Sequence, residues 1–275
     1  MNQNDLKKLL EDLDFHPSRK LGQNFMVDAN AVDYIVKMAA PAAGQRIVEV
    51  GPGFGALTRR LLASGADVTS VEFDHRLCAY LREHLCAPNF TLVEADACLV
   101  DFERLCGGQP FRVVANLPYS ISSPFVAKLL ELPVPPESMS LVLQREVAER
   151  LASVPGCKAY GSLTARVQCV YKVKYCRTMP GGIFLPRPDV ESALVSFTMK
   201  PQIPSMEERQ ALSWLLRTTF SSRRKKCLNN LAAAKPPVDY AQIFQELGLA
   251  PDIRAERIAP DDYLRIVRAA AVRPG

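Results

Sequence analysis

An amide, a proline and an aromatic ring lie close together in the stretch Asn116-Leu117-Pro118-Tyr119. Asn116 offers a side-chain oxygen as an acceptor, and Pro118 disfavours the α conformation for Leu117, so that local carbonyls face outward. Tyr119 supplies a flat ring on which a heterocycle can stack. Together these groups can accept the two hydrogens of an exocyclic amine and localise its lone pair as a bond forms. Taken alone, the stretch also fits a turn without chemistry.

A glycine-rich turn, Gly51-Pro52-Gly53-Phe54-Gly55, joins an apolar run to a helix-compatible pattern. Glycines let a ligand lie against the backbone, and the N-terminus of the following helix presents unpaired N–H groups. The spacing Gly51-x-Gly53-x-x-Ala56 also satisfies the dinucleotide fingerprint. The turn therefore indicates a nucleoside cofactor and leaves a nicotinamide dehydrogenase open.

Two acidic residues follow the next apolar runs. Glu72 lies 21 residues after Gly51, close to the offset of roughly 20 residues at which an acid meets a ribose hydroxyl pair. Asp96 follows the third run. Acids at strand ends are common helix caps, but three successive strands ending in a glycine turn, Glu72 and Asp96 favour a shared ligand site.

The elements that must position these residues are predicted by alternation of apolar runs and helical stretches, which favours a parallel sheet. We expect strands over residues 47–50, 67–71, 90–93, 112–115 and 139–143. In such a sheet the ligand crevice lies at the carboxyl ends of the strands. The acids and the Asn116 turn should therefore meet at one edge.

The two ends of the chain have other patterns. Residues 1–15 predict a short amphipathic helix, and residues 19–26 predict a flap that closes over a ligand. A helix capped by Asp28 should run to about Ala40, before Pro41. After Pro201–Pro204 we expect helices over residues 207–220, 226–233, 240–247 and 260–270. The predicted organisation is a large α/β domain over residues 1–200, with the N-terminal flap, and a small basic helical domain over 201–275.

Composition bounds the class of protein. The chain has 275 residues, 48% hydrophobic and 23% charged, which suits a globular protein with one large and one small domain. The N-terminus is too charged for a signal peptide, and no apolar run could span a bilayer, so we expect a cytoplasmic protein without membrane association. Of the net charge of +5, residues 201–275 contribute +4, from 12 Lys/Arg and 8 Asp/Glu. This excess indicates a polyanionic partner.

Eight cysteines are spread without a C-x-x-C pair, and three histidines are scattered. No zinc-ligand spacing is present, so we expect free thiols in a reducing compartment and no metal. Nothing in the pattern favours obligate oligomers, and we expect a monomer.

Several stretches together extend these single motifs from about Lys20 to Leu264. They are Gln23-Asn24-Phe25, Glu49-Val50-Gly51-Pro52-Gly53, Glu72, Asp96-Ala97, Asn116-Leu117-Pro118-Tyr119, Phe184-Leu185-Pro186-Arg187-Pro188-x-Val190-x-Ser192-Ala193, Phe220-Ser221-Ser222-Arg223-Arg224-Lys225 and Arg254-Ala255-Glu256-Arg257. They resemble the ribosomal RNA adenine N6,N6-dimethyltransferase family. The match is best with the branch that dimethylates two adjacent adenosines in the 3′-terminal hairpin of small-subunit (16S) rRNA during ribosome biogenesis.

The resemblance implies a Rossmann-like methyltransferase sheet, S-adenosylmethionine as methyl donor, S-adenosylhomocysteine as product and the assembling small subunit as partner. It assigns the cofactor pocket to Asn24, Met26, Gly51, Gly53, Glu72, Asp96, Ala97 and Asn116. It assigns the target adenine to Asn116, Leu117, Pro118 and Tyr119, with Phe184 stacking on the far face of an extruded base. It assigns RNA phosphate contacts to Arg223, Arg224, Lys225 and Lys226.

Two departures from the family pattern are present. Met26 stands where leucine is more usual, which suits an apolar packing role, and Ser222 stands where glutamine is frequent, which puts one polar RNA contact in doubt.

Two further functions stay open at this point. One is a large-subunit rRNA adenine methyltransferase of the antibiotic-resistance type, and the other is a non-catalytic nucleic-acid-binding factor with the same fold.

Overall fold

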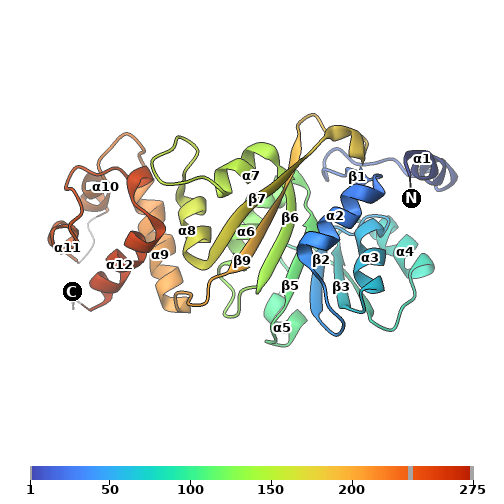
Figure 1. Cartoon of the computed structure of the whole chain (residues 1–275), viewed down its shortest axis with the longest axis horizontal. Coiled ribbons are helices and arrows are strands. Elements are labelled where there is room, and N and C mark those ends of the chain that lie inside the picture. The colour runs from blue at the N-terminus through green and yellow to red at the C-terminus, as the bar shows by residue number, and fades with distance from the viewer. Residues whose placement is uncertain (1, 235–237, 273–275) are drawn as a thin grey trace. The chain divides into compact units, whose positions relative to one another are not determined.

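The computed structural model describes residues 2–234 and 238–272 (Figure 1). Two compact units divide the chain. One unit comprises Met1–Ala148 and Lys174–Thr198, and the other comprises Glu149–Val173 and Met199–Gly275.

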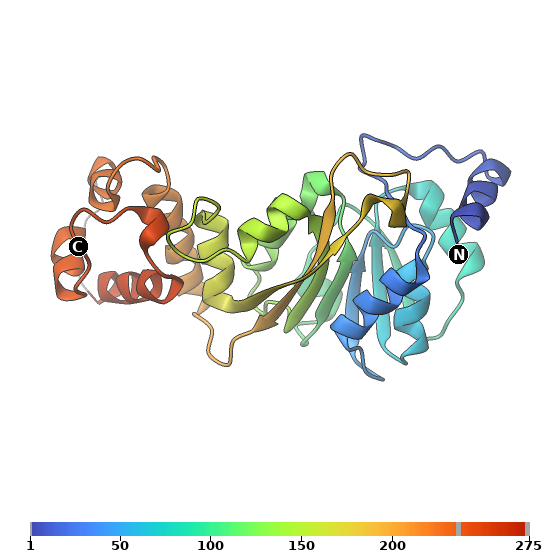
Figure 2. The same cartoon turned by 45° about the horizontal axis from the view of Figure 1, so that its top comes forward.

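A seven-stranded sheet with the order β4-β3-β2-β5-β6-β9-β7 forms the centre of the first unit. Its strands are β2 (Arg46–Val50), β3 (Asp67–Glu72), β4 (Phe90–Glu94), β5 (Arg112–Asn116), β6 (Ser138–Gln144), β7 (Tyr171–Met179) and β9 (Ser192–Met199). Strands β2 to β6 pair in parallel, whereas β9 pairs antiparallel with β6. The five predicted strands are confirmed. The sequence analysis missed β7 and β9, which Figure 2 shows as long neighbouring strands.

The helices of this part of the chain alternate with the strands. They are α1 (Gln3–Asp12), α2 (Ala29–Ala39), α3 (Ala56–Ala63), α4 (His75–His84), α5 (Phe102–Cys106), α6 (Ser122–Leu129) and α7 (Arg145–Leu151), with short 3-10 turns η1 (Tyr119–Ile121) and η2 (Gly181–Ile183). The Asp28 carboxylate caps α2 by accepting from the Ala31 N–H, as predicted from its position before an apolar periodicity.

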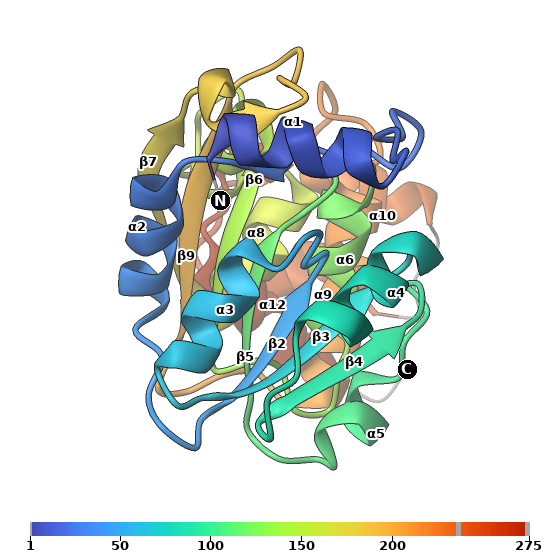
Figure 3. The same ribbon diagram turned by 90° about the vertical axis from the view of Figure 1, so that its right-hand side faces the viewer.

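One face of the sheet is covered by α2 and α3 (Figure 3). Ile35 of α2 and Leu61 of α3 are fully buried there against Val114 of β5 and Leu194 of β9. Apolar side chains along the strands thus pack against these helices. The polar residues stand where the parallel strands end, so they lie together at the carboxyl-terminal edge of the sheet.

The N-terminal part of the chain lies over that edge. Leu6 of α1 packs in one cluster with Phe15, Phe54 and Leu77, so α1 covers the turn after β2 (Figure 3). A two-stranded sheet joins β1 (Phe25–Met26) to β8 (Phe184–Leu185), with Met26 opposite Phe184. Strands of two residues carry no periodic signal, which is why sequence analysis did not predict this pairing.

The second unit is helical. It contains α8 (Ser162–Val170), α9 (Met206–Thr219), α10 (Cys227–Ala233), α11 (Tyr240–Glu246), η3 (Ala255–Arg257) and α12 (Pro260–Ala271). The four helices predicted after residue 201 are confirmed. The sequence analysis placed the domain boundary after residue 200, and the structure places it after residue 198. The helical unit also includes an earlier segment, residues 149–173, which the sequence analysis assigned to the first domain. The reason is packing: Ala165 and Cys169 of α8 are buried in the same core as Leu212 and Tyr263.

Candidate active site

A single cavity of about 220 Å³ brings together the residues predicted for cofactor and target base. It lies in the first unit, at the carboxyl ends of β2, β3, β4 and β5. All twelve predicted positions line it, namely Asn24, Met26, Gly51, Gly53, Glu72, Asp96, Ala97, Asn116, Leu117, Pro118, Tyr119 and Phe184. The expectation that Glu72, Asp96 and the Asn116 turn meet at one edge of the sheet is confirmed; the roles of all twelve residues stay predictions.

The glycine turn brings backbone against this cavity. Gly51, Gly53 and Gly55 all have positive φ angles, and Gly55 is the N-cap of α3. A Cβ atom at Gly53 would lie 2.9 Å from the Phe25 ring, so only glycine fits between the turn and β1. The Gly51 N–H donates to the Val71 carbonyl, which holds the turn against β3.

The Glu72 carboxylate is fixed by three backbone donors. One of its oxygens accepts from the N–H groups of Phe73 (2.9 Å) and Asp74 (3.0 Å), and the other accepts from the Gly53 N–H at 3.3 Å. The side chain is 7% exposed, and burial raises the pKa of Glu72 against these hydrogen bonds. A carboxylate held in this way suits a pair of hydroxyl donors.

Asp96 and Ala97 follow β4 beside Glu72, because the Ala95 N–H donates to the Glu72 carbonyl. One Asp96 oxygen accepts from the Cys98 N–H at 2.7 Å, which fixes the carboxylate in a tight turn. This arrangement places a second acceptor on the cavity wall, where it can receive the hydrogens of an amine.

The Asn116 amide is oriented by the flap. Its nitrogen donates to the Asn24 carbonyl at 3.0 Å, and since a carbonyl can only accept, the amide oxygen must face the other way. The adjoining Leu117 is anchored on both sides, with its side chain 2% exposed and its N–H donating to the Val142 carbonyl at 3.2 Å. Pro118, with φ −53° and ψ 134°, continues as extended backbone into η1.

The Tyr119 ring is held at its far end. Its hydroxyl is 2.7 Å from the Ser192 hydroxyl, at the buried start of β9, and burial raises the pKa of Tyr119. Ser192 belongs to the proline-rich stretch noted in the sequence, but no spacing signal predicts that it meets Tyr119, 73 residues away.

We expect Ser192→Ala and Tyr119→Phe to lower the turnover of methyl transfer by similar factors, roughly three- to tenfold, because each removes one side of the same hydrogen bond. The double variant should be no slower than the worse single one. Steady-state kinetics of the four proteins measure the coupling. Strictly multiplicative losses would mean that the hydroxyl contact does not position the ring.

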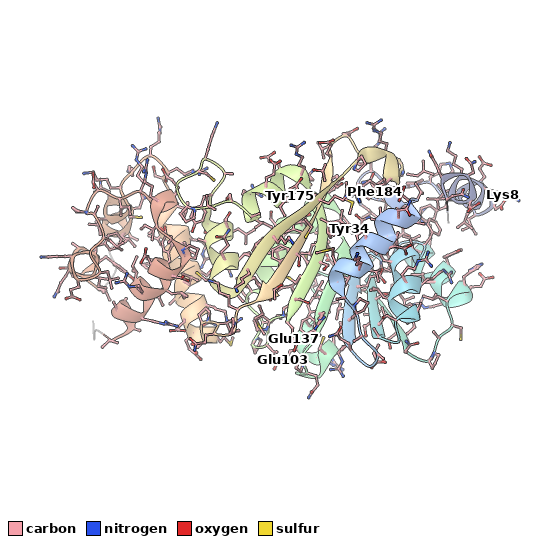
Figure 4. All side chains as sticks on the ribbon, in the orientation of Figure 1. Lys8, Tyr34, Glu103, Glu137, Tyr175 and Phe184 are labelled. Carbon is pink, nitrogen blue, oxygen red and sulfur yellow. The ribbon has the colours of Figure 1, made fainter. Side chains whose placement is uncertain are left out.

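Phe184 lines the cavity from β8 but is only 3% exposed. Its ring packs in the core with Ala31 and Ile35 of α2, close to which Figure 4 labels it. A stacking face for a base therefore requires that this ring turn outward or that the base meet its edge. The stacking role stays a prediction.

Phe73 is a residue that sequence analysis missed. It lines the cavity directly after Glu72 in the chain, and its side chain is 60% exposed. The signal was available in the sequence, since an aromatic residue directly after the acid predicted to bind the ribose could cover a flat heterocycle.

Glu49, two residues before the glycine turn, is a buried acid outside the cavity lining. One of its oxygens accepts from the hydroxyls of Thr58 and Ser70, both at 2.7 Å, and the other has no hydrogen-bond partner among the described residues. Burial raises the pKa of Glu49 to about 7, against the hydrogen bonds from Thr58 and Ser70. The fold therefore favours the protonated acid over the carboxylate.

A raised pKa has a definite sign for stability. Protonated Glu49 contributes its full stabilisation of the fold below the ordinary pKa of 4.5, and this stabilisation is lost as pH rises through about 7. Between pH 5 and pH 8 we expect the titration of Glu49 to lower the unfolding free energy by roughly 2–3 kcal/mol. Urea unfolding at several pH values in this range should show a smaller loss of unfolding free energy for Glu49→Gln than for the unaltered protein. The same pH dependence in both proteins would mean that Glu49 is ionised in the fold.

The basic turn between α9 and α10, residues 223–226, is exposed in all four side chains. Arg223 differs from the others, because its guanidinium donates to the carbonyls of Lys158 and Tyr160, both at 2.8 Å. Arg224, Lys225 and Lys226 make no ion pair with any residue that the structure describes.

Among residues 2–234 and 238–272, no cluster of His, Cys, Asp and Glu is arranged to hold a metal ion. The helices of the same residues include none that is long and apolar enough to cross a membrane.

Solved structures share this architecture. A dimethyladenosine transferase from Plasmodium falciparum superposes with a TM-score of 0.73 at 25% identity, over 88% of this chain and 95% of that one. The 23S rRNA methyltransferase ErmE gives a TM-score of 0.70 at 24% identity, over 90% of this chain and 100% of that one. The fold is that of a Rossmann-like methyltransferase with a helical C-terminal part, as predicted.

The sequence narrows the class further. The ribosomal RNA adenine dimethylase family model matches residues 15–271, and the chain therefore belongs to that family. A protein of Chlorobium luteolum named ribosomal RNA small subunit methyltransferase A is 42% identical over 216 residues, 78% of each chain. Its namesake in Magnetococcus marinus is 39% identical over 256 residues, 91% of each chain. The resemblance stated from the motifs is confirmed.

Proposed function

We propose that the protein transfers methyl groups from S-adenosylmethionine to N6 of two adjacent adenosines in the 3′-terminal hairpin of 16S rRNA, and so dimethylates each of them. The observation that carries this proposal is the Asn116 amide, which is held on the Asn24 carbonyl in the same cavity as Glu72 and Asp96. Relatives named ribosomal RNA small subunit methyltransferase A support the choice of RNA.

The cavity fits the methyl donor chemically. Glu72 offers a backbone-fixed carboxylate for the two ribose hydroxyls, and Asp96 offers an acceptor for the adenine amine. Gly51 and Gly53 line the cavity and bring no side chain into it, and Met26 and Ala97 add apolar lining. When bound, S-adenosylmethionine supplies an electrophilic methyl group on a sulfonium sulfur.

The chain's own residues act on the target amine. The Asn116 amide oxygen and the Leu117 carbonyl accept the N6 hydrogens, which localises the nitrogen lone pair toward the methyl donor. Tyr119 covers one face of the adenine, with its hydroxyl held by Ser192. As N6 gains a methyl group it becomes positively charged, and the same two oxygens stabilise that charge until the proton leaves to water. This scheme needs no buried general base.

RNA phosphates are proposed to bind at the basic turn of the second unit. The Cys227 N–H donates to the Ile253 carbonyl at 2.9 Å, which brings the segment around Arg254 and Arg257 beside Lys226. The two neighbouring segments both carry exposed cations, which supports phosphate contact in this part of the unit.

The remaining parts of the proposal concern context. We propose that the enzyme acts on assembling small subunits in the cytoplasm and works as a monomer. Light scattering of the purified protein at assay concentration tests the last point, with a mass near 30.4 kDa expected.

The decisive experiment uses small ribosomal subunits that lack this modification. They are incubated with the protein and labelled S-adenosylmethionine, and the modified nucleosides are located by mass spectrometry. N6,N6-dimethyladenosine at both adjacent adenosines is the expected result. Label on protein-free large-subunit RNA instead would assign the resistance-type activity. No label on either RNA, with no S-adenosylmethionine binding by calorimetry, would leave a nucleic-acid-binding factor.

A further inference from the structure

A short segment covers one side of the cavity, and we name residues 15–24 the strap. Five of its residues line the cavity, namely Lys20, Leu21, Gly22, Gln23 and Asn24. A Cβ atom at Gly22 would lie 3.3 Å from the Pro118 side chain, and the Asn24 carbonyl receives the Asn116 amide. The position of the strap therefore decides where the Asn116 amide oxygen points.

The strap is held by a carboxylate that is not among the residues lining the cavity. Asp74 is 5% exposed, and one of its oxygens accepts from Gln23 Nε2 at 2.8 Å and from Arg76 Nη2 at 2.7 Å. Its other oxygen accepts from the Arg76 N–H and Nε at 3.0 and 3.1 Å. Four donors thus converge on one side chain, and one of them comes from the strap.

The same carboxylate reaches the beginning of the strap through Arg76. The Arg76 guanidinium carbon lies 4.1 Å from the centroid of the Phe15 ring, and that ring packs edge-on against Phe25 and Phe54. Within the strap, the Gln23 side-chain oxygen accepts from the Ser18 N–H at 2.7 Å. Asp74 therefore ties down both ends of the strap.

From these contacts we propose that Asp74 is a positioning residue, which holds the strap in place so that the Asn24 carbonyl orients the Asn116 amide. The inference rests on the proposed function, since it concerns the orientation of the group that accepts the target amine. Asp74 also touches the cofactor side, because its own N–H donates to Glu72.

The Asp74 carboxylate stays ionised at the pH of enzyme assays. Burial acts to raise the pKa of Asp74, but the hydrogen bonds from Arg76 and Gln23 outweigh it and lower the pKa to about 2. This stabilisation is present above the ordinary pKa of 3.8 and is lost only as pH falls toward 2. Assays near neutral pH therefore compare variants with an ionised Asp74.

The test uses Asp74→Asn, which keeps a good N-cap for α4 but places an amide opposite the donors of Gln23 and Arg76. The matched control is Asp101→Asn, the same change at the N-cap of α5, where the carboxylate accepts from the Arg104 N–H. Gln23→Met serves as a second variant, because it removes the strap's bond to Asp74, together with the bond from Ser18 within the strap, and leaves the pair of Asp74 with Arg76 intact.

Two readouts are needed: hydrogen–deuterium exchange of the peptide covering residues 15–24, and kcat on small subunits at saturating S-adenosylmethionine. We expect Asp74→Asn and Gln23→Met to speed exchange in the strap by roughly tenfold and to lower kcat by a similar factor. Asp101→Asn should change neither.

Unchanged exchange in both strap variants would overturn the proposal, whatever the kinetics. Faster exchange with wild-type kcat would also overturn it, because the strap would then be held without effect on catalysis. Should the unaltered protein fail to methylate small subunits, the proposed function fails, and the exchange experiment still measures whether Asp74 holds the strap.

Discussion

Replacing Asn116 with alanine is expected to lower kcat for methyl transfer by about a hundred- to a thousandfold, as for other losses of one oriented acceptor or donor at a transition state. The reason is that the amide oxygen contributes most when N6 becomes positive. It contributes less to the bound ground state, so the loss should fall on kcat more than on the KM for RNA. Steady-state kinetics on unmodified small subunits measure both constants.

A matched control is available at Asn89. Its amide also donates to a backbone carbonyl, that of Ala66 at 2.7 Å, but it lies outside the cavity lining. Asn89→Ala should lower stability by about 1 kcal/mol and leave kcat unchanged. If Asn116→Ala keeps wild-type turnover, or if Asn89→Ala loses as much, Asn116 does not have the assigned role.

Asn116→Asp sharpens the same test. A carboxylate keeps an acceptor for the target amine but sets an oxygen against the Asn24 carbonyl, which can only accept. We therefore expect this variant to be nearly as slow as Asn116→Ala, because orientation and not mere acceptor chemistry is lost.

The parallel part of the fold could be predicted because its signals are local. Strands such as Arg46–Val50 are short apolar runs bounded by turns, and α2 begins at a capping aspartate. Strand β7 was missed although exposed Lys172 and Lys174 alternate with less exposed neighbours, the pattern of a strand with one solvent face. The grouping of α8 with the C-terminal helices depends on packing between segments far apart in sequence, which no local pattern encodes.

The candidate site likewise has features that the sequence predicts and features that only the folded structure shows. Residues at strand ends, such as Glu72, Asp96 and Asn116, could be predicted because parallel strands bring their carboxyl ends to one edge. The partners that hold them could not, since the bond from Asn116 to Asn24 spans 92 residues and that from Gln23 to Asp74 spans 51. The burial of Phe184 in one core with α2 also depends on residues far apart in the sequence. Sequence thus predicts which groups meet, and tertiary packing decides how each is oriented.

The second large effect that we expect comes from removing the three cations of the basic turn that make no ion pair with a described residue, Arg224, Lys225 and Lys226. The variant Arg224→Ala/Lys225→Ala/Lys226→Ala should flatten the dependence of log affinity on log salt by roughly 2–3 units, if each cation neutralises one phosphate. Binding to small subunits measured between 50 and 200 mM salt gives the slope. Calorimetry with S-adenosylmethionine should be unaffected, because the cavity residues lie in the other unit.

Arg223 supplies the internal control, because its guanidinium already donates to the carbonyls of Lys158 and Tyr160. Arg223→Ala should lower the unfolding free energy by about 1–2 kcal/mol through these lost bonds. It should change the salt slope less than any one of the three neighbouring substitutions. If Arg223→Ala flattens the slope as much as they do, the guanidinium contacts RNA in spite of its two carbonyl partners. An unchanged slope in the triple variant would mean that the turn is only a solvated surface and that RNA binds elsewhere on the protein.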